Sequence, residues 1–163
     1  MFYFVTGSEG CGKSAIIPFL RDRLPHATVV DFDNAVRPYD FTEGWSNEVL
    51  EEVVRKHAGP SDVVVVGLTN PEQIAQRLRP EEYRVVVLSV SEQARRSRLR
   101  QRGAGRSVAA DTEYLAYFQQ LAAGGRVLAV IDTSSVGPES VAIQVVGALR
   151  ARPEDRTSGS DAR

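Results

Sequence analysis

Near its amino end the chain carries a glycine-rich segment whose geometry leaves few folds open. It reads Gly7-Ser8-Glu9-Gly10-Cys11-Gly12-Lys13-Ser14 and fits the pattern G-x-x-x-x-G-K-[ST]. An apolar run precedes it and an amphipathic segment follows. Glycines let a backbone curl until successive N–H groups point inward at phosphate oxygens, and the dipole of the next helix adds to their field. The segment therefore predicts a phosphate-binding loop between a strand and a helix.

Each residue type in this segment has an expected part in nucleotide binding. Lys13 is expected to reach the β- and γ-phosphates, and the hydroxyl of Ser14 is expected to bind Mg²⁺. Lysine occurs only at positions 13 and 56, among 20 basic residues, so one of the two lysines falls where a compact ammonium is needed. The residues expected to bind the nucleotide are Gly7, Glu9, Gly10, Cys11, Gly12, Lys13 and Ser14.

Cys11 lies inside the predicted loop and allows two interpretations. It is a small residue that fits a tight turn. Alternatively, the helix N-terminus lowers the pKa of its thiol, so that alkylation blocks nucleotide binding and ATP protects.

The composition of the 163-residue chain narrows the class of protein. It is 42% hydrophobic and 25% charged, which is typical of one globular domain and not of a disordered or fibrous chain. The net charge of −1 gives no support to a general nucleic-acid binder, and no apolar run is long enough to span a membrane. The amino end does not read as a secretion signal, and one cysteine makes neither an internal disulfide nor a zinc site, so a cytoplasmic protein is expected.

Short apolar runs alternate with helical patterns along the chain. The runs hold four or five residues, are rich in β-branched side chains and lack polar alternation, as in parallel strands covered on both faces. This alternation predicts right-handed crossovers and an α/β fold, a three-layer α/β/α sandwich with a five-stranded parallel sheet. The expected strands are 2–6, 27–31, 63–66, 85–88 and 127–131, and the expected helices begin near residues 13, 46, 70, 91, 111 and 138.

Three features depart from this regular pattern. Pro18 lies inside the first expected helix, where its missing N–H is expected to kink the chain. Residues 34–44 are polar and aromatic with no period, which predicts a loop near a site. Residues 151–163 lack core-forming side chains and predict a disordered tail after a domain at 1–150.

A phosphate-binding loop alone leaves GTPases, ATPases, switch proteins and kinases open. No Asn-Lys-x-Asp follows a strand, and the third expected strand ends in Val66-Gly67 without the acidic residue of a motor ATPase. The order of motifs over residues 1–150 resembles the P-loop small-molecule kinases of the adenylate-kinase-like group, which includes shikimate, gluconate and nucleoside or nucleotide kinases. The resemblance implies the P-loop containing nucleoside triphosphate hydrolase fold, with ATP and Mg²⁺ as cofactors.

The motif Asp31-Phe32-Asp33 at the end of the second expected strand is part of this resemblance. An extended strand would put both carboxylates on one face, where they could hold the Mg²⁺ shell and orient or deprotonate an acceptor hydroxyl. With Gly67 at its end, the third expected strand resembles that of the kinases in which this strand ends in glycine. In those kinases a carboxylate of the second strand binds the metal. The resemblance thus implies Ser14, Asp31 and Asp33 as metal ligands, and a solvated strand end is the alternative.

A run of arginines is similar to a second family motif. Arg98-Leu99-Arg100-Gln101-Arg102 matches Arg-Leu-x-x-Arg, which ends the helix before a mobile lid. The resemblance implies that Arg98 lies against the adenine and Arg102 contacts ATP phosphates, beside Arg106 and a short lid at about 103–110. Guanidinium groups that close over the transferred group would neutralise its charge and exclude water. An arginine-rich solvated helix is the alternative.

The acceptor side is less specific in sequence. The family binds its acceptor between the second and third strands, which here gives a segment at about 34–58. Arg37 could bind an anionic acceptor group, Tyr39 and Trp45 could stack on a ring, and Asn70 could hydrogen-bond the acceptor. Surface, packing or capping roles are the alternatives for each. The chain lacks the Gly-Gly-Gly run of shikimate kinases and the Asp-Gly-[FY]-Pro-Arg stretch of adenylate kinases, so no member of the family is assigned.

Together these motifs predict an ATP-dependent phosphotransferase for a small-molecule acceptor, with a nucleoside or nucleotide slightly favoured over a sugar acid. The expected catalytic residues are Lys13, Asp33, Arg98, Arg102 and Arg106, and the expected acceptor-binding residues are Asp33, Arg37 and Asn70. Neither a membrane nor nucleic acid is an expected partner, and the chain is expected to be a monomer or homodimer. Two other functions stay open: a nucleotide-binding regulatory protein without transfer activity, and a kinase of a polynucleotide end.

Overall fold

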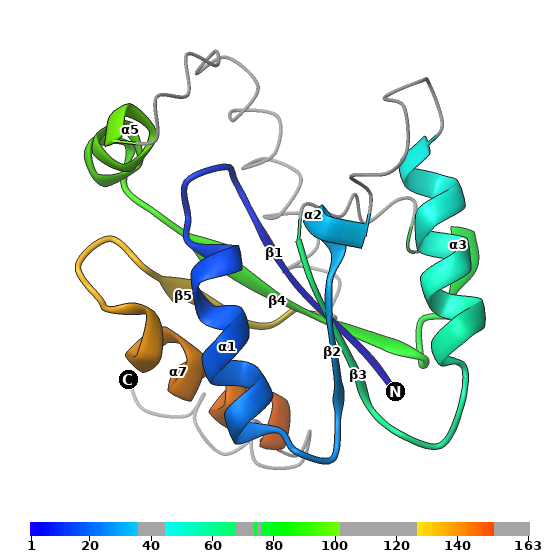
Figure 1. Cartoon of the computed structure of the whole chain (residues 1–163). Coiled ribbons are helices and arrows are strands. Elements are labelled where there is room, and N and C mark those ends of the chain that lie inside the picture. The colour runs from blue at the N-terminus through cyan, green and yellow to red at the C-terminus, as the bar shows by residue number, and fades with distance from the viewer. Residues whose placement is uncertain (36–44, 68–73, 75, 102–126, 152–163) are drawn as a thin grey trace, which may run out of the picture.

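The computed structural model describes residues 1–35, 45–67, 74, 76–101 and 127–151, and shows a five-stranded sheet with helices on both faces (Figure 1). Every strand pair is parallel, and the strand order is β2-β3-β1-β4-β5. The predicted three-layer fold with a parallel sheet is therefore confirmed. The strands are β1 (Phe2–Gly7), β2 (Thr28–Asp31), β3 (Val63–Val66), β4 (Tyr83–Ser89) and β5 (Val127–Asp132).

The helices lie close to their predicted starts. Ser91 caps one of them, since its Oγ accepts the N–H of Ala94 at 3.4 Å. Ser46, predicted as a cap, lies in the first turn instead, because the helix begins at Trp45. No helix in the described ranges combines the length and hydropathy that a bilayer crossing needs. The helices are α1 (Lys13–Arg23), α2 (Phe32–Ala35), α3 (Trp45–His57), α5 (Glu92–Gln101) and α7 (Pro138–Arg150).

Several predicted segments lie partly or wholly outside the described residues. The helix expected from residue 111, the lid at about 103–110 and the tail after residue 151 all do so. Within the helix expected from residue 70, Ile74 and 76–77 are helical. The prediction of a loop at 34–44 is wrong at its start, because residues 34 and 35 belong to α2.

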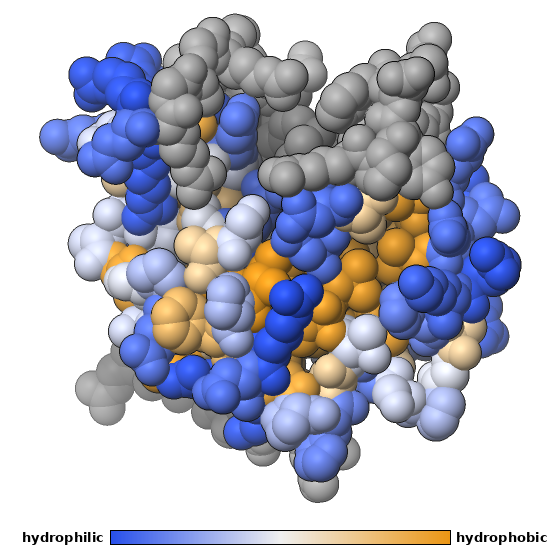
Figure 2. Space-filling view, in the orientation of Figure 1, coloured by the Kyte–Doolittle hydropathy of each residue, from blue (hydrophilic) through white to orange (hydrophobic). Residues whose placement is uncertain are grey.

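Hydrophobic residues are buried on both faces of the sheet. The four valines of β3 are each at most 2% exposed, because alternate side chains enter opposite layers. One layer packs α1 and α7 on the sheet, and the other packs α3 on it. In Figure 2 apolar side chains show between α1 and α3, whereas the outer surfaces of α3 and α5 are hydrophilic. Continuous burial on both faces explains why the strands lack polar alternation.

α1 continues through Pro18, so the proline does not end the helix. Pro18 is exposed, and the buried side of the helix consists of Lys13, Ile16, Ile17 and Leu20. Packing of that side on the sheet holds the helix where proline removes one backbone hydrogen bond.

The strand order places the amino-terminal loop at the centre of the sheet. β1 lies between β3 and β4, so that β2 and β3 are on one side of it and β4 and β5 are on the other. In open parallel sheets, ligands bind beyond the carboxyl ends of the strands where the strand order reverses. Residues 7–12, which link β1 to α1, lie at this position.

Candidate nucleotide-binding site

The loop at residues 7–12 owes its curl to glycines in the left-handed half of backbone space. Gly7, Gly10 and Gly12 have φ angles of 153°, 83° and 99°. Gly12 is also the N-cap residue of α1, so no side chain accepts a hydrogen bond from the first N–H groups of this helix. A Cβ at Gly7 would lie 2.2 Å from the carbonyl oxygen of Leu88 on β4. The loop can therefore pass over β4 only with glycine at its first position.

Lys13 directs its ammonium group back into this curl. Its side chain is 7% exposed, and Nζ donates to the carbonyl oxygens of Gly7 at 2.7 Å and Ser8 at 3.0 Å. The positive charge is thus held against the loop by two backbone oxygens, with the sulfur of Cys11 3.9 Å away. A charge held in this way, at a helix N-terminus, attracts anions.

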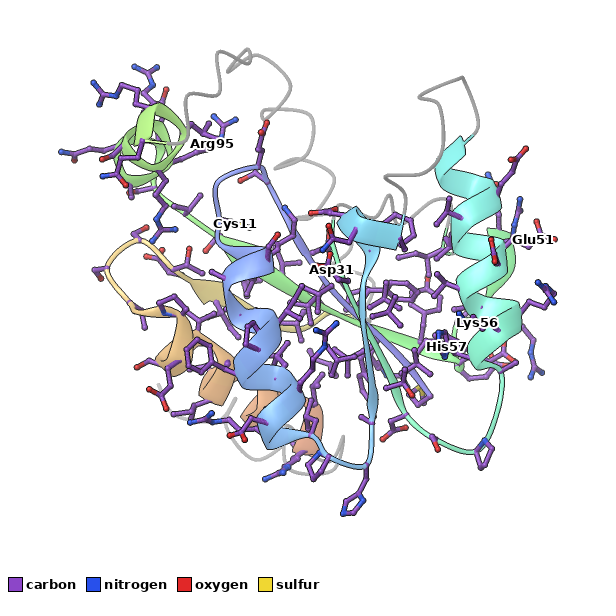
Figure 3. All side chains as sticks on the ribbon, viewed as in Figure 1. Cys11, Asp31, Glu51, Lys56, His57 and Arg95 are labelled. Carbon is purple, nitrogen blue, oxygen red and sulfur yellow. The ribbon has the colours of Figure 1, made fainter. Side chains whose placement is uncertain are left out.

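Two arginines of α5 hold the next two carbonyl groups of the loop. Arg95 Nε donates to the oxygen of Glu9 at 2.9 Å, and Arg98 Nη1 donates to the oxygen of Gly10 at 3.2 Å. A Cβ at Gly10 would lie 3.2 Å from Cγ of Arg95, so the loop and α5 are in close contact. Figure 3 shows Arg95 extending from α5 on the side of the loop.

Thr133, in the segment after β5, contacts both the loop and Arg98. Its Oγ1 lies 2.8 Å from the carbonyl oxygen of Cys11 and 3.1 Å from Nη1 of Arg98. Arg98 Nη2 also donates to the main-chain oxygen of Thr133. The phosphate-binding loop, α5 and the β5–α7 segment therefore meet at one buried hydroxyl, which is 2% exposed.

Sequence reasoning assigned no side-chain contact to Arg95 or Thr133. Arg95 is 4% exposed and shares its buried side of α5 with Leu99, four residues on. The spacing of Arg95 and Leu99 could have indicated that Arg95 is buried. Residues four apart lie on the same side of a helix, and a leucine usually lies on the buried side. For Thr133 the sequence holds no such signal.

The prediction that Asp31 and Asp33 share one face of a strand is wrong. β2 ends at Asp31, and α2 begins at Phe32. Asp31 caps this helix, since its Oδ1 accepts the N–H of Asn34 at 3.1 Å. Aspartate is among the strongest N-cap residues, and capping together with burial of Phe32 turns the chain where a strand was expected.

Gly67 has a steric role that explains why no acidic residue follows β3. A Cβ at this position would lie 2.7 Å from Cβ of Phe32 and 2.9 Å from Oδ1 of Asp33. The Gly67 N–H donates to the oxygen of Val5 at 3.2 Å, so this point adjoins β1. The carboxylate of Asp33 thus occupies the space beyond the end of β3.

The oxygens near the loop are compatible with Mg²⁺. In the described part of the chain no three His, Cys, Asp or Glu side chains gather into a metal site. Mg²⁺ at nucleotide sites keeps several waters and takes only one or two protein oxygens in addition to phosphate oxygens. Ser14, exposed in the first turn of α1, and Asp33 offer such a set. Asp31 fits less well, because Asn34 engages both of its oxygens.

The structure contradicts the hypothesis of an activated thiol at Cys11. The side chain is fully buried, and this burial raises the pKa of the thiol, although the nearby charge of Lys13 acts in the opposite direction. Desolvation of the thiolate outweighs the helix dipole. Cys11 is therefore a small packed residue of the loop.

We expect the thiol of Cys11 to react more slowly with iodoacetamide in the folded protein than in urea. The rate of the folded protein should also rise at a higher pH than that of the unfolded chain, because the raised pKa leaves less thiolate at a given pH. Alkylation kinetics between pH 7 and 10 measure both effects. A folded protein that reacts faster than the unfolded chain at pH 7 would contradict the burial argument.

The positions of several other predicted site residues are not described by the structure. Arg37, Asn70, Arg102 and Arg106 lie outside the described residues, as does Tyr39, and the side chain of Trp45 is not described. His57 and Lys56 lie at the end of α3 remote from the loop (Figure 3).

Comparisons with known proteins connect this geometry to a group of enzymes. No family model and no curated protein matches the chain. Solved structures match over almost its whole length. A gluconokinase from Sinorhizobium meliloti has a TM-score of 0.66 at 15% identity and covers 90% of each chain. A shikimate kinase from Aquifex aeolicus has a TM-score of 0.62 at 16% identity, covering 91% of this chain and 96% of its own.

A third match was solved with ligands. It is the APS kinase from Mycobacterium tuberculosis in complex with AMPPNP and APS, with a TM-score of 0.62, 16% identity and coverage of 92% of this chain and 97% of its own. The chain has the fold of the P-loop small-molecule kinases. This confirms the resemblance seen in the sequence motifs at the level of the fold.

Proposed function

We propose that this protein is an ATP-dependent phosphotransferase that acts on a small-molecule acceptor. The observation that carries the proposal is the ammonium of Lys13, held inside a curl of three positive-φ glycines at the centre of a parallel sheet. The kinase names of the structures that share the fold support the same class of activity.

The residues of the loop would bind the triphosphate. The N–H groups of the glycine curl and the charge of Lys13 bind β- and γ-phosphate oxygens, which stabilises charge that develops during transfer. Ser14 and Asp33 would hold Mg²⁺, which when bound neutralises charge on the phosphate oxygens. Arg98 donates to the loop and to Thr133, and we propose that the flat face of its guanidinium lies against the base.

Asp33 is the residue we assign to the acceptor. The acceptor hydroxyl oxygen bonds to the γ-phosphorus, the bond from that phosphorus to the bridging oxygen breaks, and ADP leaves. The hydroxyl proton passes to the carboxylate of Asp33, which lies beyond β3 next to β1. Arg102 and Arg106 follow α5 in sequence and are proposed to close over the transferred group.

We favour a nucleoside or nucleotide as acceptor, because the segment at 34–58 carries aromatic and cationic residues. A screen of nucleosides, nucleoside monophosphates, sugar acids and other hydroxylated metabolites for ADP release tests this choice. Transfer to a polynucleotide end is a further arm, with binding at low salt as its first measurement. Binding of ATP without transfer to any acceptor would instead favour a regulatory protein.

Asp33→Asn separates a kinase from a nucleotide-binding protein. The variant is expected to keep ATP binding, which rests on the loop and Lys13, and to lose at least about 100-fold in kcat, the typical contribution of general base catalysis. Asp22→Asn, at an exposed position near the end of α1, is the matched control and should keep full activity. Equal turnover in the two variants would remove Asp33 from the mechanism.

A further inference from the structure

Three successive carbonyl groups of the loop accept hydrogen bonds from side chains outside it. Arg95 holds the oxygen of Glu9 and Arg98 holds that of Gly10, while Thr133 Oγ1 lies 2.8 Å from the oxygen of Cys11. We call these three donors, Arg95, Arg98 and Thr133, the collar. Each comes from α5 or from the segment after β5.

The collar sets the direction of the N–H groups as well. A trans peptide unit is planar, and its N–H points opposite to its C=O. With the oxygens of Glu9, Gly10 and Cys11 turned toward the collar, the N–H groups of the three following residues point away from it. The N–H of Cys11 is directed to the oxygen of Ser8 at 3.3 Å, within the loop. The collar therefore holds the loop in an orientation in which the N–H groups of Gly10 and Gly12 face away from α5 and can meet a ligand.

The proton of the Thr133 hydroxyl has one main acceptor. A hydroxyl donates one hydrogen bond, and two carbonyl oxygens lie near it, that of Cys11 at 2.8 Å and that of Ser89 at 3.0 Å. The oxygen of Ser89 already accepts the backbone N–H of Thr133 at 2.9 Å. We therefore assign the hydroxyl's hydrogen bond to the oxygen of Cys11, which is the shorter contact and has no other donor from Thr133, and the hydroxyl oxygen then accepts from Nη1 of Arg98.

The surrounding chain fixes this hydroxyl in place. Asp132 accepts the N–H of Ser134 at 2.9 Å, and Oγ of Ser134 accepts the N–H of Ser91 at 2.7 Å at the start of α5. The segment after β5 is thereby attached to β4 and α5 on both sides of Thr133. Its hydroxyl does not have to be ordered when a ligand arrives.

From these contacts we propose that Thr133 is a positioning residue for the phosphate-binding loop. Its hydroxyl fixes the Cys11–Gly12 peptide and the guanidinium of Arg98 together, so that the phosphate and base sides of a nucleotide site are set by one group. The benefit to nucleotide affinity rests on the proposed function, whereas the effect on the loop does not.

Thr133→Val tests the proposal through a reporter in the chain itself. It removes the hydroxyl with little change of shape, and Cys11, the chain's one cysteine, reports opening of the loop by its rate of alkylation in the folded protein. We expect this rate to rise about tenfold, as the loss of one or two hydrogen bonds implies. Thr133→Ser, which keeps the hydroxyl, should restore the rate of the native protein.

Thr28→Val is the matched control, since it makes the same exchange at the first residue of β2, away from the carboxyl ends of the strands. Circular dichroism confirms folding of each variant. If Thr133→Val does not fold, Arg98→Gln, at a half-buried position, removes the other side of the contact and should also raise the alkylation rate. Native alkylation rates in both collar variants would overturn the proposal, as would equal rates for the valine and serine variants.

Calorimetry with Mg-ATP separates this proposal from the proposed function. We expect the Kd of the valine variant to rise about tenfold and that of the serine variant to stay near the native value. If the native protein bound no Mg-ATP, the proposed function would fail, while the alkylation rates, which need no nucleotide, would still decide the role of Thr133.

Discussion

Lys13→Met is expected to lower kcat/KM for phosphoryl transfer by about 10²- to 10³-fold, the effect of removing one preorganised electrostatic contact. Methionine has a similar length and remains compatible with a side chain that is 7% exposed, so the loss is one of charge. The ammonium donates to two backbone oxygens of the loop and lies 3.9 Å from the sulfur of Cys11, so removing its charge should leave the fold in place. ADP release with saturating acceptor measures the loss.

The chain offers a matched control for this experiment. Lys56, its other lysine, is exposed at the end of α3 and lies remote from the loop (Figure 3). Lys56→Met should keep the native kcat/KM. Equal activities of the two variants would show that the charge in the loop has no part in transfer.

Gly7→Ala is expected to lower the free energy of unfolding by about 2–4 kcal/mol, through both strain and overlap. The φ of 153° disfavours a side chain, and the new Cβ would lie 2.2 Å from the oxygen of Leu88, a backbone atom of the adjoining strand. Relief of this overlap must move the loop away from β4, so nucleotide affinity should fall too. Urea unfolding gives the stability, and calorimetry gives the affinity.

Gly147→Ala supplies a control of opposite sign. Gly147 lies in α7, and a Cβ there would meet nothing within 4 Å. Alanine should raise the free energy of unfolding by up to about 1 kcal/mol, since it has the higher helix propensity. A Gly7→Ala protein as stable as the native one would contradict the close approach of loop and strand.

The parts of the fold that the sequence predicted are those with local causes. The four valines of β3 indicated burial on both faces, and the glycines at 7, 10 and 12 indicated a curled loop, because each pattern follows from short-range sterics. The boundary between β2 and α2 was missed for a local reason as well. Three residues are too few to distinguish an extended Asp-Phe-Asp from a helix capped by Asp31.

The site was predictable only where a motif covers it. Arg95 and Glu9 are 86 positions apart, and Thr133 and Cys11 are 122 apart, so only the folded sheet brings them together. Of the two interpretations of Cys11, the one with a lowered pKa is contradicted, because its sequence position shows the helix dipole and not the burial. Likewise, the space that Gly67 leaves for Asp33 depends on how α2 packs on β3.

Amide chemical shifts of the ¹⁵N-labelled protein test most directly whether backbone N–H groups at residues 7–14 bind a nucleotide polyphosphate. Mg-ATP and inorganic triphosphate are expected to shift the amide signals of Gly10, Gly12, Lys13 and Ser14, whereas adenosine alone is expected to leave them in place. In Lys13→Met the shifts with Mg-ATP should require much higher concentrations. Unchanged signals from these four amides at saturating Mg-ATP, or shifts confined to other parts of the chain, would contradict the account.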